Sequence, residues 1–177
     1  MVVRAFEQFY PVLHPTVYID EMAMVSGQVT IGEDSSVWPM TVIRGDVNTI
    51  TIGQRTNLQD GSVLHVTHAN ETYTSDAGFS LDIGDDVTVG HKALLHACQV
   101  HDRCLIGMGA IVLDGAVIES ETLLAAGSLV PPGKVLEGGY LWMGSPAVRV
   151  RRLSEKEINY FAYSAAHYVQ LKDRTKV

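Results

Sequence analysis

The chain has 177 residues and a formal net charge of −7 at pH 7. This length fits one domain that can bury a core without disulfide bonds. Nucleic-acid-binding and membrane-surface proteins carry a clustered basic face, which this acidic sequence lacks, so we expect neither a nucleic acid nor a membrane as a partner.

The sequence contains no apolar run of about 18 residues and no secretory apolar segment after Arg4, so we expect a cytoplasmic protein. Its two cysteines, Cys98 and Cys104, have a C-x5-C spacing. Zinc knuckles and redox pairs have other spacings, so we interpret both residues as reduced and structural.

Residues 1 to 18 lack a regular pattern and contain Phe6, Phe9 and Tyr10. We expect an irregular lead-in that covers the first open end of a repetitive core.

From Ile19 an aliphatic residue returns about every six positions, with interruptions after Ile43 and Leu64. A six-residue period fits neither a helix nor a two-residue alternation, but it predicts short strands separated by regular corners. Three such hexads would make one coil of a parallel β-helix, whereas a β-sandwich would not require so constant a spacing. The spacing leaves the handedness open, and the general crossover rule favours a right-handed path.

The tail changes period. Ser154 and Glu157 form a capping-box pattern, and a helical stripe follows at Ile158, Phe161, Ala165, Tyr168 and Val169. We therefore predict an all-β fold with a C-terminal helix, in which residues 1–153 form the lead-in and β-helix and residues 154–177 form a helix. This helix would pack on its own β-helix or on a neighbour. Residues 66 to about 80 contain no hexad and are expected to form a protruding loop.

Three histidines lie within this repeat. His65 follows the inward Leu64 and His96 follows the inward Leu95, so both should face outward on one face, in adjacent coils about 5 Å apart. His91 falls at a corner of a different face, and a neighbouring copy could supply it to the same ion. A closed three-fold ring would then hold three identical sites, which predicts a homotrimer. Three imidazoles with an open fourth position favour a catalytic Zn²⁺, and Fe²⁺ or Co²⁺ would accept the same ligands.

Four polar residues map beside these histidines. Arg44 lies one coil below His65 and Asp46 lies near the corner, where they could pair between subunits or form an exposed ion pair of little value. Asp60 falls beneath His91 and could fix its tautomer, while Gln59 could orient a metal-bound water.

The segments Ile31-Gly32-Glu33-Asp34-Ser35-Ser36 and Ile106-Gly107-Met108-Gly109-Ala110-Ile111 resemble the hexapeptide-repeat proteins, whose coil is left-handed. Three further segments resemble the γ-class carbonic anhydrases over nearly the whole chain, and most of all their bacterial YrdA-type branch. These segments are Arg44-Gly45-Asp46, Asn57-Leu58-Gln59-Asp60-Gly61-Ser62-Val63-Leu64-His65 and Gly90-His91-Lys92-Ala93-Leu94-Leu95-His96.

The resemblance implies a left-handed β-helix that forms a homotrimer and holds zinc between subunits on His65, His91 and His96. It places Arg44 and Asp46 in the subunit contact, with Asn57 in the motif around the site. It also places Gln59 and Asp60 beside the metal water and matches Tyr163 with a tyrosine near that pocket. The implied reaction is the reversible hydration of carbon dioxide to bicarbonate.

The proton shuttle departs from the family pattern. Active members carry a shuttle glutamate where this chain has Val66-Thr67-His68, and a second glutamate is replaced by Val47. His68 could take over the proton transfer, because an imidazole titrates near neutral pH, or it could be a loop histidine without a task. We therefore expect a metal site with weak activity.

Two other functions stay open. Many hexapeptide-repeat proteins are acyltransferases that use acetyl-CoA and a catalytic histidine, and saturable CoA binding without metal would favour that class. A non-catalytic, zinc-stabilised trimeric binding module would instead bind zinc without hydration above background.

Overall fold

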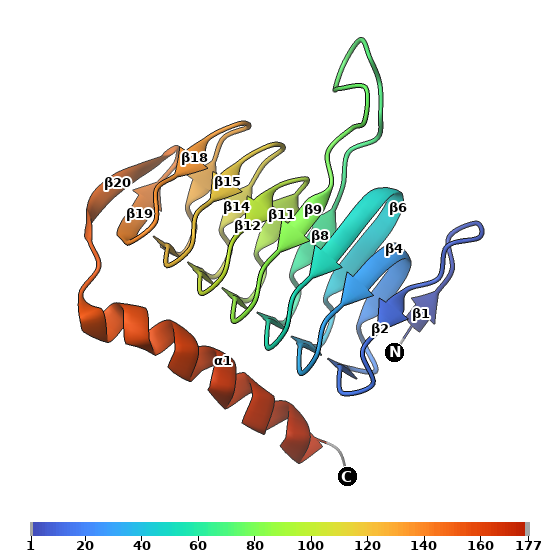
Figure 1. Ribbon diagram of the computed structural model, residues 1–177, viewed down its shortest axis with the longest axis horizontal. Coiled ribbons are helices and arrows are strands. Elements are labelled where there is room, and N and C mark those ends of the chain that lie inside the picture. Colours follow the sequence, from blue (N-terminus) through green and yellow to red (C-terminus); the bar gives the residue numbers. More distant parts are fainter. Residues whose placement is uncertain (1, 176–177) are drawn as a thin grey trace.

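The computed structural model describes residues 2–175, which form a three-sided β-solenoid with one C-terminal helix (Figure 1). The hexads make short strands, and each strand pairs in parallel with its counterparts one coil before and one coil after it. The aliphatic residue of each predicted hexad is buried, apart from the partly buried Ile19. The stacked aliphatic residues therefore form one continuous core, as the six-residue period predicts.

The strands fall on three faces, and the long strands β4 (Met24–Ile31) and β6 (Val42–Ile52) turn a corner and belong to two of them. The first face holds β1 (Val2–Arg4), the first halves of β4 and β6, β8 (Val63–His65), β11 (Leu94–His96), β14 (Ile111–Val112) and β17 (Leu129–Val130). The second holds β2 (Val12–Leu13), the second halves of β4 and β6, β9 (Leu81–Ile83), β12 (Gln99–Val100), β15 (Val117–Ile118) and β18 (Val135–Leu136).

The third face holds β3 (Tyr18–Ile19), β5 (Ser36–Val37), β7 (Asn57–Leu58), β10 (Thr88–Val89), β13 (Leu105–Ile106), β16 (Leu123–Leu124) and β19 (Tyr140–Gly144). Strand β20 (Ala147–Arg152) pairs with β19 in the antiparallel direction, so this hairpin ends the parallel stack.

The N-terminal segment differs from the irregular lead-in that we expected. Strands β1, β2 and β3 pair with β4 and β5 and so build a coil of their own. Phe6, Phe9 and Tyr10 are exposed, while Val3 and Leu13 pack against the core. Val3 and Leu13 pair with Val25 and Ile31 but lie ten residues apart, so the six-residue period does not run through this first coil.

The interruption after Ile43 is an outward excursion of the chain at one corner. Strands β4 and β6 pair up to Gly27 and Gly45, and the pairing resumes at Val29 and Ile50. Residues 46–49 of β6 therefore lie opposite a single residue of β4, Gln28. A Cβ atom at Gly27, which has a φ of 80°, would lie 2.2 Å from the carbonyl oxygen of Gly45. Only glycine permits this close backbone contact, and the excursion that follows it carries Asp46 out from the corner.

The second interruption is a loop between β8 and β9 that projects from the solenoid (Figure 1). Thr67 and Phe79 close its base through two backbone hydrogen bonds of 3.1 Å. The side chain of Asn48 donates to the carbonyl oxygens of Thr67 and Ala77, at 3.2 and 2.9 Å. The base of the loop is therefore tied to the excursion of β6.

Helix α1 (Glu155–Thr175) begins at the predicted capping box, where Ser154 Oγ and the Glu157 carboxylate each accept from the other residue's backbone N–H. Phe161 and Ala165 are buried. The helix runs back along the third face of its own solenoid (Figure 1), and Tyr168 meets Trp38 edge to face with ring centroids 5.6 Å apart. Of the two packing partners that the sequence left open, the helix contacts its own chain.

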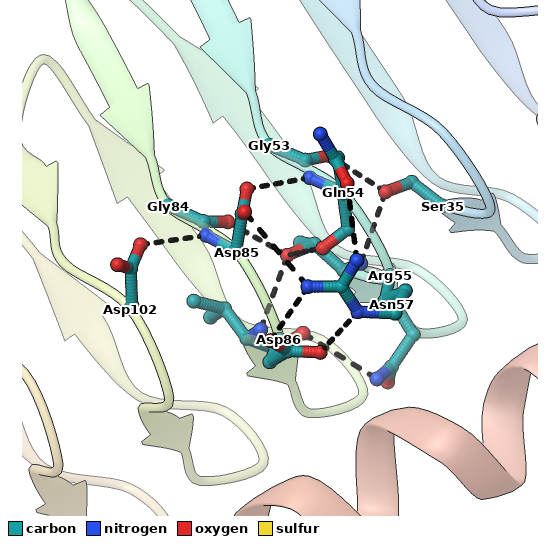
Figure 2. Close-up of polar contacts among 11 residues, drawn as sticks. Ser35, Gly53, Gln54, Arg55, Asn57, Gly84, Asp85, Asp86 and Asp102 are labelled. Carbon is teal, nitrogen blue, oxygen red and sulfur yellow. Dashed lines mark hydrogen bonds and ion pairs between the residues drawn. The ribbon is translucent and has the colours of Figure 1, made fainter.

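Acidic side chains link successive coils at another corner (Figure 2). The Arg55 guanidinium forms two hydrogen bonds to the Asp86 carboxylate, of 2.6 and 2.8 Å. One coil further on, Asp102 Oδ1 accepts from the backbone N–H of Asp85 at 2.8 Å, and a Cβ atom on Gly84 would lie 2.2 Å from that oxygen. Glycine at this position therefore makes room for the carboxylate that joins the two coils.

Among residues 2–175, which contain the single helix α1, no helix is both long and apolar enough to cross a bilayer.

Candidate metal centre

His65 and His96 lie side by side on the first face, in adjacent coils. The backbone ladder pairs His96 with His65 and His65 with Arg44, which is the register that the hexad count predicts. The Nδ1 atom of His65 lies 3.1 Å from the Nε2 atom of His96. Each ring is half-buried, so the pair is open to solvent or to another chain on one side.

The Asp46 carboxylate contacts Nε2 of His65, while Nδ1 of the same ring faces His96. Its Oδ1 atom lies 2.9 Å from His65 Nε2, and its Oδ2 atom contacts Arg44 of the same chain. Burial opposes ionisation of Asp46, but hydrogen bonds from His65 and Arg44 outweigh it and hold the pKa of this carboxyl below its ordinary value. Burial also lowers the pKa of His65, more than Asp46 raises it. The His65 ring is therefore neutral at neutral pH, the form in which imidazole binds metals.

Asp114 holds the far nitrogen of His96, and our reading of the sequence did not identify it. Its Oδ1 atom lies 2.6 Å from His96 Nδ1, and its Oδ2 atom accepts a hydrogen bond from the Thr67 hydroxyl. Burial would raise the pKa of Asp114, but the hydrogen bonds from Thr67 and His96 outweigh it and lower this pKa. The register could have pointed to this residue, because Val112 pairs with Leu95 and Asp114 lies two positions later, at the corner.

His91 lies at a different corner from the other two histidines, after strand β10. Its Nδ1 atom is 2.9 Å from Asp60 Oδ2, so the predicted position of Asp60 beneath this ring agrees with the structure. The two rings at the other corner do not meet it: among residues 2–175, no group of three His, Cys, Asp or Glu side chains is placed to hold a metal ion. One chain therefore brings together two of the three predicted ligands.

A groove of about 360 Å³ lies beside His91, between α1 and the third face. The nearly buried Gln59 lines it and donates to Asn57 Oδ1 at 3.1 Å. Asn57 in turn donates to Thr88, whose hydroxyl lies 2.8 Å from that of Ser164 on the helix. This network fixes Gln59 at the edge of the groove.

His68 and Tyr163 lie apart from these groups. His68 is exposed in the projecting loop, where its carbonyl oxygen accepts from Thr74 at 2.8 Å. Tyr163 lies on the exposed side of α1, with its ring between those of Tyr160 and His167. The helix side chains that do line the groove are Tyr160, Ser164 and Tyr168, and the sequence interpretation selected none of them as a site residue.

The donor set of His65 and His96 fits a divalent metal such as zinc. The outer nitrogens face ionised carboxylates, which can only accept hydrogen bonds, so the ring protons belong on those outer atoms. The inner nitrogens then present two lone pairs to each other at 3.1 Å, an arrangement that a cation stabilises. Zinc–nitrogen bonds of about 2.0 to 2.1 Å in tetrahedral geometry would set two such nitrogens about 3.4 Å apart.

The fold and these residues define a hexapeptide-repeat protein with paired imidazoles and carboxylates on its corners. No family model matches the chain. Protein YrdA of Escherichia coli is 49% identical over 172 residues, which are 97% of this chain and 92% of YrdA. The mitochondrial γ carbonic anhydrase 2 of Arabidopsis thaliana is 43% identical over 161 residues, which are 91% of this chain and 57% of the plant protein.

Two solved structures have the same fold. A hexapeptide transferase family protein from Anaplasma phagocytophilum superimposes with a TM-score of 0.90 at 39% identity, over 98% of each chain. A Bacillus cereus protein described as a candidate acetyltransferase gives a TM-score of 0.90 at 36% identity, over 98% of this chain and 95% of the other. With these relatives, the chain belongs to the γ carbonic anhydrase and YrdA-like family of hexapeptide-repeat proteins.

Proposed function

We propose that this protein is a γ-class carbonic anhydrase-like metalloprotein that interconverts carbon dioxide and bicarbonate in the cytoplasm. It would act as a homotrimer of left-handed β-helices. In each site His65 and His96 of one subunit would bind zinc together with a His91 from a neighbouring subunit. The family membership supports this proposal, and so does the distance of 3.1 Å between His65 Nδ1 and His96 Nε2.

The observation that carries the proposal is that each of the three histidines has one ring nitrogen in contact with a carboxylate. Asp46, Asp60 and Asp114 each face one ring nitrogen, which leaves His65 Nδ1, His91 Nε2 and His96 Nε2 as the nitrogens without a carboxylate partner. Ligating histidines in metalloproteins are oriented in this way by carboxylates behind them. His91 lies at another corner, so a second copy is the natural source of the third ring.

The residues would divide the work as follows. A bound zinc ion supplies Lewis acidity that makes water a nucleophile near neutral pH. Gln59, fixed by Asn57, borders the groove beside His91 and is placed to orient a reacting water or bicarbonate. Arg44, which contacts Asp46, is exposed at the face that would meet a neighbour. The exposed His68 is the candidate for carrying the proton to solvent, since an imidazole side chain can accept and release a proton.

Acyl transfer is the second candidate, because the two solved structures with a TM-score of 0.90 bear transferase descriptions. Such an enzyme would bind an acyl-CoA and would need one catalytic histidine rather than three. Contacts between three carboxylates and the imidazoles of His65, His91 and His96 favour a metal site over acyl transfer. A non-catalytic zinc-stabilised trimer is a third outcome, distinguished by bound metal without turnover.

The test compares the native protein with His65→Ala, His91→Ala and His96→Ala. We expect about one zinc per chain and carbon dioxide hydration in the native protein, and loss of both in each variant, with His101→Ala as an exposed-histidine control. Stoichiometric metal in His91→Ala would overturn the shared site. Bound zinc without hydration would leave the binding module, and metal-independent acetyl transfer from acetyl-CoA would favour the acyltransferase.

A further inference from the structure

We propose that Asp114, held in place by Thr67, is a positioning residue that keeps the ring proton of His96 on Nδ1 and so leaves Nε2 free to bind metal. The metal part of this inference rests on the proposed function. The tautomer part does not, because it concerns a hydrogen bond within one chain.

The geometry of Asp114 uses both of its oxygens. Oδ1 faces His96 Nδ1 at 2.6 Å, and Oδ2 accepts from the Thr67 hydroxyl. Thr67 is itself fixed, because its backbone pairs with Phe79 at 3.1 Å in both directions and its carbonyl oxygen accepts from Asn48. A carboxylate with both oxygens engaged cannot swing away from the ring, so its orientation is set by the base of the projecting loop.

The alternative tautomer would close the site. With its proton on Nε2, His96 could donate directly to His65 Nδ1, which lies 3.1 Å away. That hydrogen bond would occupy both lone-pair positions that a metal ion needs. An ionised carboxylate at Nδ1 disfavours this state, because it would then face the lone pair of Nδ1 and would lose its donor.

This contact also couples the loop to the metal site. Thr67 lies two residues after His65, near the start of the loop of residues 66–80, and its hydroxyl donates to Asp114, the residue that contacts His96. A change that displaces the loop base would therefore reach His96 through Asp114, although the loop itself contributes neither imidazole of this pair.

The experiment uses the full-length protein with Asp114→Asn and Thr67→Val. An asparagine amide can present a donor as well as an acceptor, so it no longer excludes the closed tautomer, and the valine removes the hydroxyl at constant shape. Ser80 and Asp82 form the same kind of hydroxyl–carboxylate pair, at 2.6 Å, on the second face rather than on the first face with His65 and His96, which makes Asp82→Asn the matched control. Imidazole nitrogen shifts measured by NMR on metal-free protein report the tautomer, and competition with a chelator reports zinc affinity.

We expect His96 in the Nδ1–H form in the native protein and in Asp82→Asn, and a mixture with the Nε2–H form in Asp114→Asn. Zinc affinity should fall roughly 10- to 100-fold in Asp114→Asn, the usual effect of removing such a partner, and by less in Thr67→Val. An unchanged tautomer in Asp114→Asn would overturn the inference. If no variant binds zinc, including the native protein, the proposed function fails, while the NMR result still decides the role of Asp114.

Discussion

Asp60 Oδ2 lies 2.9 Å from His91 Nδ1, at a corner that neither His65 nor His96 shares. His91 thus has the same kind of carboxylate partner as His65 and His96, although among residues 2–175 no group of three His, Cys, Asp or Glu side chains is placed to hold a metal ion. Under the proposed function, each chain would carry one half-site with two imidazoles and another with one, and a closed ring of copies would bring unlike halves together.

Mixing two inactive variants tests this arrangement. His91→Ala lacks the single-imidazole half-site, and His96→Ala lacks part of the paired half-site. Unfolding and refolding them together should restore zinc to about one quarter of the sites, because each subunit pair then draws its two halves at random. Metal analysis and hydration assays measure the recovery. A zinc content of the mixture no higher than that of the variants refolded separately would show that the three histidines do not meet across subunits.

The role of His68 as proton carrier is tested by His68→Ala under weak buffering. If this exposed imidazole shuttles the proton, the turnover number should fall by up to about 100-fold, near the low end of general acid–base effects. Added imidazole buffer should restore it, and zinc content should not change. His101→Ala, another exposed histidine, is the control. Equal turnover of the native and His68→Ala proteins in weak buffer would show that His68 does not carry the proton.

The buried Lys172 ties the end of α1 to an early coil. Its Nζ atom lies 3.0 Å from Asp34 Oδ1, and its side chain is 1% exposed. Burial would lower the pKa of Lys172, but hydrogen bonds from its amine to Asp173 and Asp34 outweigh it and raise this pKa. We expect Lys172→Met to lower the free energy of unfolding by about 1 to 2 kcal/mol, whereas the exposed Lys156→Met should change it little. Urea titration measures both, and equal effects would contradict the contribution of this ion pair.

The same ion pair predicts a pH dependence. The hydrogen bond from Lys172 is the main cause that holds the pKa of Asp34 below its ordinary value in the folded protein. The unfolded chain therefore takes up a proton at Asp34 first as the pH falls, so this contribution is complete above about pH 4 and is lost as the pH falls through the lower folded pKa. The difference in stability between the native protein and Asp34→Asn should shrink across that acidic range. A difference that stays constant from pH 6 to pH 3 would contradict it.

The two cysteines should be inert in the folded protein. Both are free and buried, and burial raises the pKa of the Cys104 thiol to about 12 and that of Cys98 further. Alkylation requires the thiolate, so iodoacetamide at pH 8 should label neither residue until the protein is unfolded. Mass spectrometry with and without urea measures this. Labelling of the native protein at either cysteine would show that the coil around it opens.

The sequence predicted those parts of the fold that depend on spacing. The hexads gave the inward residues and the ladder that aligns Arg44, His65 and His96, because an inward position fixes what its neighbours face. The capping box at Ser154 likewise fixed the start of the helix, since it depends on local hydrogen bonds. The assignment of the three histidines to one ion stays a prediction.

The parts that depend on corners could not be predicted in the same way. Asp114 lies 18 residues after His96, so the register could place it in the next coil, but the contact itself depends on where a corner side chain points. The excursion that carries Asp46 depends on the close approach of Gly27 and Gly45, which shows in the sequence only as a slip of the hexads. Strand β1 was missed because it belongs to a first coil whose long corners hide the period.

Helix α1 begins beside the last hairpin and ends beside an early coil, so it spans most of the solenoid (Figure 1). In a bare stack of repeats each layer contacts only the layers next to it, and such arrays fray from their ends. Because α1 contacts coils at both ends of the stack, it couples the stability of coils that do not touch each other. Heat or denaturant should therefore unfold this protein in one cooperative step, and a truncation of α1 should let the N-terminal coils unfold first.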